Sequence, residues 1–154
     1  MAKITNFTDE LSFLDNTATC AFEHEGLLFL SVTSACLAHR YDDTSMKRKI
    51  STMPSYKAKD YVAGRAFADD GIRQVRKHMT EEEALSLLHS KFDENEDDQY
   101  IRELQRLTDN GDEFEYHNME HDNLFGICDC ARCGGKRGRN LLGSFLTTLR
   151  SRLE

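Results

Sequence analysis

The 154-residue sequence contains no tryptophan, only one proline and no long apolar run. No apolar segment approaches the roughly 18 residues that a membrane-spanning helix needs, and the N-terminus has no signal-peptide pattern. We therefore expect a soluble cytoplasmic protein without a membrane partner. Five cysteines are present, an odd number, and three of them lie between positions 128 and 133. This usage does not suit a disulfide framework and favours reduced thiols or a metal site.

The sequence also lacks a long basic face. The net charge is −7. Residues 81–122 contain fifteen acidic residues and three lysines or arginines, whereas residues 132–154 contain one acidic residue and six lysines or arginines. Nucleic-acid binding generally needs a basic surface that neutralises phosphates, so we expect no general nucleic-acid binding. The basic C-terminal segment has enough charge for one or two phosphates of a small ligand.

Short strands and several helices are predicted along the chain. Apolar runs on both sides of Glu25-Gly26 predict a hairpin, and Ser31 fits the N-cap of a helix that reaches about Tyr41. Residues 42–54 are polar and cationic, and no element is predicted there. Further helices are expected at 55–65, 71–90, 99–107 and after Asn140, with strands at 4–7 and around 114–116. The pattern predicts one α+β domain over residues 1–154, mostly helical with a few short strands.

The most informative stretch runs from His121 to Leu149. A cysteine loop is followed by a glycine-rich basic loop and then by an amphipathic helix, for which Asn140 fits the N-cap. Such a loop at a helix N-terminus commonly binds an anionic small molecule through backbone N–H groups and charge. The alternative is a solvated basic loop. The residues concerned are Cys128, Cys130, Cys133, Lys136, Arg137 and Arg139.

A series of short motifs extends over most of the chain. They are Phe13-Leu14-Asp15-Asn16 with Cys20, Phe22, Glu23 and Gly26; Ser31-Val32-Thr33-Ser34-Ala35; Ala58-Lys59 with Gly64-Arg65; Lys91-Phe92-x-x-Asn95; His121-Asp122 with Phe125-Gly126 and the cysteine loop; and Gly138-x-Asn140-x-Leu142-Gly143. In this order the motifs resemble those of the NADAR family, also called YbiA-like, whose members are small α+β proteins associated with riboflavin biosynthesis.

The resemblance implies a cleft for an ADP-ribose-like or phosphoribosyl ligand. It also implies N-glycosidase chemistry, in which the bond between ribose C1 and a nitrogen breaks through an oxocarbenium-like state that a carboxylate stabilises. Thr33 lies where the family has that carboxylate. A hydroxyl can hold a ribose, but loss of one such charge interaction typically costs about two to three orders of magnitude in rate. Family tryptophans are replaced by Glu120, Phe125 and Ile72, and Leu37-Ala38-His39-Arg40 stands for Q-A-A-K.

The resemblance implies roles for several of the candidate residues. Arg40, Arg65 and the basic loop are expected to contact phosphates, Thr33 and Asp122 the ribose, and Phe125 the base. For each residue a purely structural role stays open: a core ring for Phe125, a simple turn for His121-Asp122 and solvated side chains for the arginines. The complete set comprises the catalytic positions Asp122 and Thr33 and the binding positions Arg40, Arg65, His121, Phe125, Gly126, Lys136, Arg137, Arg139 and Asn140.

Three functions follow as hypotheses. The leading one is a protein that binds an ADP-ribose-type or phosphoribosyl nucleotide without efficient turnover, for example a phage protein that sequesters an NAD-derived signal of host defence. The second is an active N-glycosidase that uses Asp122 and a water held by Thr33. The third is a protein-interaction domain stabilised by zinc on Cys128, Cys130 and Cys133, with Cys20, Cys36 or a histidine as fourth ligand. No cofactor besides this structural zinc is expected.

Overall fold

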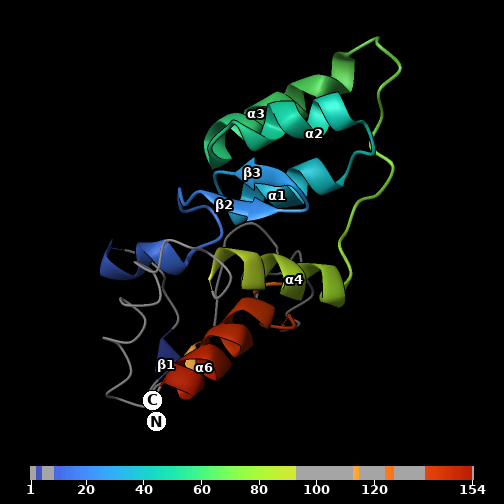
Figure 1. The fold of residues 1–154 in the computed structure, drawn as a ribbon. Coiled ribbons are helices and arrows are strands. Elements are labelled where there is room, and N and C mark those ends of the chain that lie inside the picture. Colours follow the sequence, from blue (N-terminus) through green and yellow to red (C-terminus); the bar gives the residue numbers. More distant parts are fainter. Residues whose placement is uncertain (1–2, 5–8, 93–112, 115–123, 127–137, 154) are drawn as a thin grey trace. The chain divides into compact units, whose positions relative to one another are not determined.

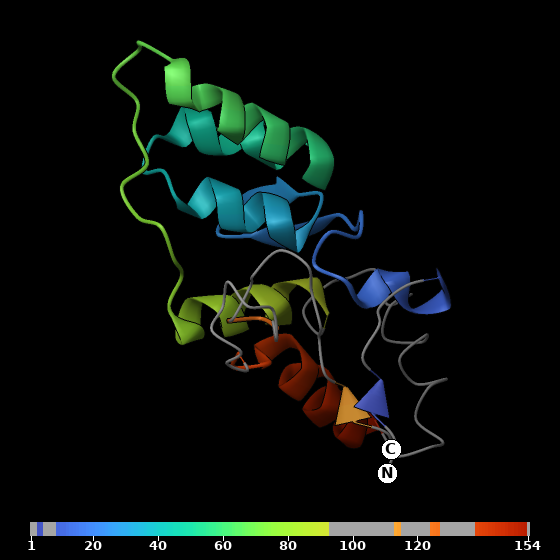
Figure 2. The same ribbon diagram turned by 180° about the vertical axis from the view of Figure 1, so that it is seen from behind.

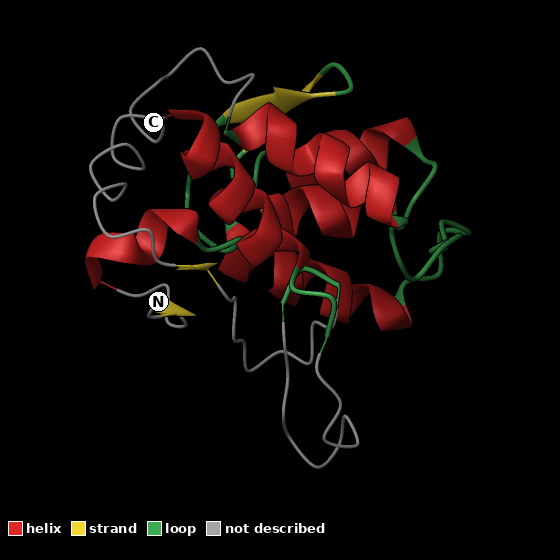
Figure 3. Ribbon diagram, turned by 90° about the horizontal axis from the view of Figure 1, so that it is seen from below, coloured by secondary structure: helices red, strands yellow, loops and turns green. Residues whose placement is uncertain are grey.

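The computed structural model describes residues 3–4, 9–92, 113–114, 124–126 and 138–153 (Figure 1). The chain divides into two compact units, one formed by Phe13–Asn95 and the other by Met1–Ser12 together with Glu96–Glu154. Helices make up most of the described secondary structure, and the strands are short (Figure 3). The predicted α+β class, mostly helical with a few short strands, is therefore confirmed.

The unit of residues 13–95 contains a hairpin and four α-helices. It follows the 3-10 helix η1 (Asp9–Leu14) and consists of β2 (Phe22–His24), β3 (Leu27–Phe29), α1 (Val32–His39), α2 (Thr44–Ser51), α3 (Ser55–Gly64), the 3-10 helix η2 (Arg65–Phe67) and α4 (Glu81–Lys91). Figures 1 and 2 show α2 and α3 side by side, with α1 next to them. Apolar side chains of the hairpin and of all four helices form the core of this unit.

The hairpin forms where the sequence predicts it. Strands β2 and β3 pair antiparallel, with Phe22 opposite Phe29. The two turn residues both have a positive φ, 52° at Glu25 and 82° at Gly26. This is the backbone of a type I′ turn, whose twist matches that of the two strands. Glutamate rarely adopts this conformation, because its Cβ approaches the backbone carbonyl.

Local caps fix where the helices begin. Ser31 caps α1 as predicted, since its side chain accepts a hydrogen bond from the backbone N–H of Ser34 at 3.0 Å. Helix α2 occupies the polar segment in which no element was predicted. Asp43 caps it by accepting from the N–H of Met46 at 2.8 Å, and Met46 and Ile50, four residues apart, are buried.

The helix predicted at 71–90 is wrong in its first half. Thr80 and Glu83 form a capping box, in which each side chain accepts from the other's backbone N–H, and this box starts α4 at Glu81. Before it, Gly71 has a φ of 78°, which a helix does not allow. The N–H groups of residues 75 and 76 donate to the carbonyl of Arg40 instead of to a helical turn.

The other unit contains a parallel strand pair and the C-terminal helix. Strand β1 (Lys3–Ile4) pairs with β4 (Glu113–Phe114), and α6 spans Leu141–Leu153. The predicted apolar stripe of α6 is confirmed, since Leu141, Leu142, Phe145, Leu146 and Leu149 are all buried. The helix predicted at 99–107 lies outside the described residues. No helix in the described part of the chain is long and apolar enough to cross a membrane.

Candidate functional site

A network of hydroxyl groups surrounds the first turn of α1. Ser31 Oγ donates to Ser34 Oγ at 3.0 Å, and Ser34 Oγ donates to the carbonyl of Met53 at 2.7 Å. Ser55 Oγ lies 2.8 Å from both Ser31 Oγ and the carbonyl oxygen of Thr17. The three serines are buried. Their bonds fix the N-terminus of α1, and with it the position of Thr33.

Thr33 and Asn16 meet beside this network. Thr33 is half-buried in the first turn of α1, and its backbone N–H donates to the carbonyl of Asn16 at 3.0 Å. The side chain of Asn16 is buried, and its Oδ1 has no hydrogen-bond partner among the described residues. Buried polar atoms are nearly always satisfied. A buried water molecule is the usual partner of such an acceptor.

Lys91 is fully buried at the end of α4. Its Nζ donates to the carbonyl of Asp15 at 3.0 Å and lies 4.8 Å from the centre of the Phe92 ring. Burial lowers the pKa of Lys91 to about 8, although Cys20 and Asp15 act in the opposite direction. Residues 15 and 16 thus connect a buried amine to the first turn of α1.

Sequence reasoning missed both Lys91 and Asn16 as candidate site residues. A signal for Lys91 was present, because it follows Ala84, Leu87 and Leu88 at the spacing of the buried stripe of α4. A lysine at such a position is unusual, since lysine is almost never fully buried unless it is paired. Perturbed groups of this kind cluster at functional sites, although a structural role is the common alternative.

Thr33 and Arg40 lie on the same face of α1. They are seven residues apart, which places them within about 20° of each other around the helix axis and about 10 Å apart along it. The backbone of Arg40 still has helical angles, with φ −66° and ψ −17°. In the described part of the chain the guanidinium of Arg40 has no hydrogen-bond or ion-pair partner. It is thus available to an anion.

Arg65 is already paired within the protein. Its guanidinium contacts the carboxylate of Asp70 with N–O distances of 2.5 and 2.8 Å, and it donates to the carbonyl of Ile72 at 3.1 Å. Hydrogen bonds from Arg65 hold the pKa of Asp70 well below its usual range, and the same pair raises the pKa of Arg65. The phosphate role of Arg65 stays a prediction, in which a ligand would replace Asp70.

The start of α6 contains several predicted site residues. Phe125 and Gly126 are buried, Arg139 is exposed, and Asn140 directly precedes the first helical residue with a φ of 50°. The backbone N–H groups of residues 140, 141 and 142 donate to the carbonyls of Gly126, Leu124 and Phe125. These three N–H groups are therefore engaged within the protein and are not available to a phosphate.

The remaining predicted site residues lie outside the described part of the chain. They are His121, Asp122, Cys128, Cys130, Cys133, Lys136 and Arg137. Among the described residues no group of three or more metal-binding side chains occurs. Of the possible fourth zinc ligands, Cys20 is buried, and Cys36 Sγ lies 4.0 Å from the sulfur of Met79. The zinc site stays a prediction.

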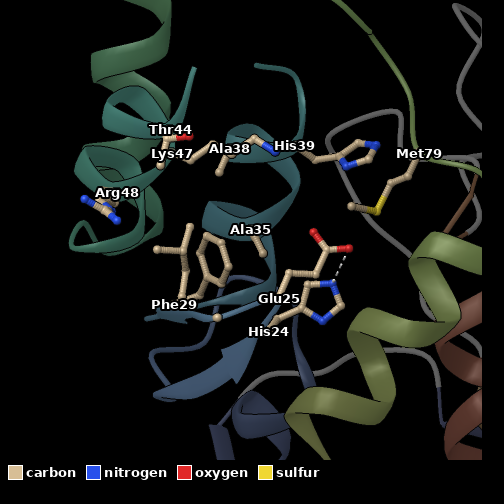
Figure 4. A pocket seen from close by; sticks show the side chains of 12 residues that line it. His24, Glu25, Phe29, Ala35, Ala38, His39, Thr44, Lys47, Arg48 and Met79 are labelled. Carbon is tan, nitrogen blue, oxygen red and sulfur yellow. Dashed lines mark ion pairs between the residues drawn. The ribbon is translucent and has the colours of Figure 1, made fainter. Parts of the chain in front are cut away.

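The unit of residues 13–95 contains a half-open pocket of about 300 Å³ (Figure 4). Its walls come from the hairpin, α1, α2 and the segment before α4. His24, Glu25, Phe29, Ala38, His39 and Lys47 are among the residues that line it. The pocket lies on another face of α1 than Thr33, since residues 35, 38 and 39 are roughly 120–160° away from residue 33 around the helix axis.

The fold has a known counterpart. The solution structure of the Escherichia coli protein YbiA superposes with a TM-score of 0.65 over 98% of this chain and 83% of YbiA, at 19% sequence identity. The chain has a YbiA-like fold. The fold implied by the NADAR resemblance is thereby confirmed, whereas the correspondence of Thr33 with the family's glutamate stays a prediction. No protein-family model matches the sequence, and no curated protein matches it.

Proposed function

We propose that this protein binds an ADP-ribose-type or phosphoribosyl nucleotide and turns it over poorly or not at all. The YbiA-like fold supports the first part of the proposal, together with the motifs that resemble the NADAR family. The second part depends on Thr33. If the ligand lies along the face of α1 that contains Thr33, a neutral hydroxyl occupies the place of the carboxylate that would stabilise the oxocarbenium-like state during cleavage.

The observation that carries the proposal is the arrangement along one face of α1. Thr33 offers a hydroxyl, and Arg40 offers a cation about two helical turns away. A ribose hydroxyl suits the first group, and a phosphate suits the guanidinium. A developing positive charge on the sugar would find no stabilising carboxylate at position 33, so binding is favoured over cleavage.

Incubation with ADP-ribosylated guanosine tests the proposal. The protein is separated from free ligand and heat-denatured, and the released compounds are analysed by mass spectrometry. We expect intact ligand, and a rise in melting temperature with added ADP-ribose. A ligand at 100 times its Kd contributes about 2.7 kcal/mol to the free energy of unfolding. Free guanosine with ADP-ribose would instead show an active N-glycosidase. If nothing is retained and the melting temperature is unchanged, the binding proposal is wrong.

Substitutions at position 33 separate binding from cleavage. Thr33→Val keeps the shape but removes the hydroxyl, and we expect it to weaken retention of ADP-ribose. Thr33→Glu supplies the missing carboxylate, and we expect release of free guanosine to rise by about two orders of magnitude or more. Thr52→Val is the matched control, because Thr52 is exposed at the end of α2. Equal retention by all three variants would contradict the placement of the ribose at Thr33.

A further inference from the structure

The pocket between the hairpin, α1 and α2 is distinct from the face of α1 that the proposed function uses. At about 300 Å³ it has the size of a small-ligand site. Alanines at positions 35 and 38 form part of its wall, and their side chains end at Cβ, which leaves space against the helix backbone. The chemistry of its lining differs from one side to the other, and this difference defines the ligand.

One side of the pocket accepts hydrogen bonds. Ser90 Oγ lies 3.1 Å from the carbonyl oxygen of Ser86 and 2.8 Å from His24 Nδ1. When the Ser90 hydroxyl donates to that carbonyl, it accepts from Nδ1, and His24 then presents a lone pair at Nε2. This atom lies 3.9 Å from Glu25 Oε1. Two acceptors at this separation can both bind one ammonium group placed between them.

Glu25 occupies this position against a backbone preference. Its φ of 52° suits asparagine or glycine in a type I′ turn much better than glutamate. The side chain is 77% exposed at the mouth of the pocket, where it is accessible to a ligand. A carboxylate in an unfavourable backbone conformation points to a function for the carboxylate itself.

The other side of the pocket is formed by α2, which contributes the hydroxyl of Thr44 and the ammonium of half-buried Lys47. In Figure 4 Thr44 and Lys47 lie above and to the left of the His24–Glu25 pair, with Ala35 between them and Phe29 to one side. Lys47 has no ion pair among the described residues. A carboxylate suits this cation, and an apolar group suits Phe29 and the alanines.

We propose that this pocket binds a small zwitterion, an apolar α-amino acid. Its ammonium group lies between His24 Nε2 and the carboxylate of Glu25. Its carboxylate contacts Lys47 and Thr44, and its side chain packs against Phe29, Ala35 and Ala38. The site does not involve Thr33 or Arg40, so it can be tested independently of nucleotide binding.

Three related probes test the proposal on the full-length chain. L-phenylalanine carries both charges, 3-phenylpropionate lacks the amine, and 2-phenylethylamine lacks the carboxylate. Binding is measured by calorimetry and by amide chemical shifts in NMR spectra. We expect L-phenylalanine to shift the amides of the hairpin and of α1, and each singly charged probe to bind about tenfold more weakly or worse, because one charge-assisted interaction is lost.

Two variants assign the ends of the ligand. Glu25→Asn removes the carboxylate and relieves the backbone, so it folds, and it should weaken L-phenylalanine and 2-phenylethylamine but not 3-phenylpropionate. Lys47→Gln should weaken L-phenylalanine and 3-phenylpropionate but not the amine. The matched controls are Glu23→Gln on β2, which is exposed, and Lys49→Gln on α2, whose Nζ lies over the ring of Tyr61.

Three results would overturn the proposal. The first is the absence of amide shifts in the hairpin and α1 when L-phenylalanine is added at millimolar concentration. The second is equal binding of the three probes, and the third is equal effects of the test and control variants. Either of these two would show an apolar pocket without charge recognition. ADP-ribose retention is measured on the same samples, and it should be unchanged in Glu25→Asn and Lys47→Gln.

Discussion

Helix α1 has one face that contains Thr33 and another that contains Ala35 and Ala38, and the stability of the fold depends more on the first than on the second. The face that contains Thr33 follows a buried network of serines, and it is connected through residues 15 and 16 to the buried amine of Lys91. The face that contains Ala35 and Ala38 lines a half-open pocket whose charged groups are exposed or half-buried. A buried polar group without a partner costs free energy of folding, whereas polar groups at a pocket mouth are free to select a ligand.

This difference predicts how substitutions act. Changes in the buried network should alter the free energy of unfolding, and changes at the pocket should alter binding with little effect on folding. The three predictions that follow test this contrast in order of expected effect, and the third lies on the pocket face.

The largest effect is expected at Lys91. The pKa of its side chain is about 8 in the folded protein and 10.5 in the unfolded reference. Between these pH values the unfolded chain holds a proton that the folded chain has lost, so raising the pH stabilises the fold. We expect the free energy of unfolding to rise by about 3 kcal/mol from pH 8 to pH 10.5 relative to Lys91→Met. Urea denaturation at several pH values measures this difference.

The exposed Lys49 provides the control for this experiment. Lys49→Met should follow the pH dependence of the unmodified protein, because the substitution lies at an exposed position and leaves buried Lys91 in place. If the free energy of unfolding depends on pH in the same way for Lys91→Met and for the unmodified protein above pH 8, the predicted lowering of the Lys91 pKa is wrong.

A smaller effect is expected at the N-cap of α1. Ser31→Ala removes the acceptor for the N–H of Ser34 and one contact of Ser55 Oγ. Loss of such a cap costs about 1–2 kcal/mol of stability, which urea denaturation at neutral pH can resolve. Ser45→Ala, at an exposed position of α2, should change stability by less than about 0.5 kcal/mol. Similar losses in both variants would show that the serine network contributes little.

The smallest effect is expected at His39, on the pocket face. Burial lowers the pKa of His39, and Glu83 opposes this shift from a distance of 3.1 Å. Below pH 6.5 the unfolded chain therefore binds a proton more readily than the folded chain, and stability falls as the pH decreases. We expect His39→Gln to reduce this fall in thermal melts between pH 7.5 and pH 5, and the exposed control His78→Gln to leave it unchanged. An unchanged fall in His39→Gln would contradict the direction of the shift.

The sequence predicted the elements whose signals are local. The Ser31 cap, the Glu25-Gly26 turn, the helix at α3 and the apolar stripe of α6 depend on a few neighbouring residues, and all are confirmed. Helix α2 was missed because it buries just two apolar side chains, those of Met46 and Ile50, which is too few for a visible apolar stripe. A helix was wrongly extended through residues 71–79 because apolar spacing outweighed Gly71 and the Thr80 capping box.

The candidate site was predictable only in part. Thr33 and Arg40 were identified through the motif resemblance, and the structure places both on one face of α1. Lys91 and Asn16 were not identified. The spacing of residues along the chain does not show that the amine of Lys91 is fully buried or that the amide oxygen of Asn16 has no hydrogen-bond partner among the described residues. The pocket residues come from the hairpin, α1 and α2, and no single motif contains them.

By itself, the sequence determined the α+β class, the turn and cap positions and the hydroxyl at position 33, because these depend on residue identity and short-range geometry. Only the tertiary structure decided that Lys91 is buried beside Asp15 and that His24, Glu25 and Lys47 line one pocket. Burial and the juxtaposition of distant segments arise from packing, which no local pattern of residues specifies.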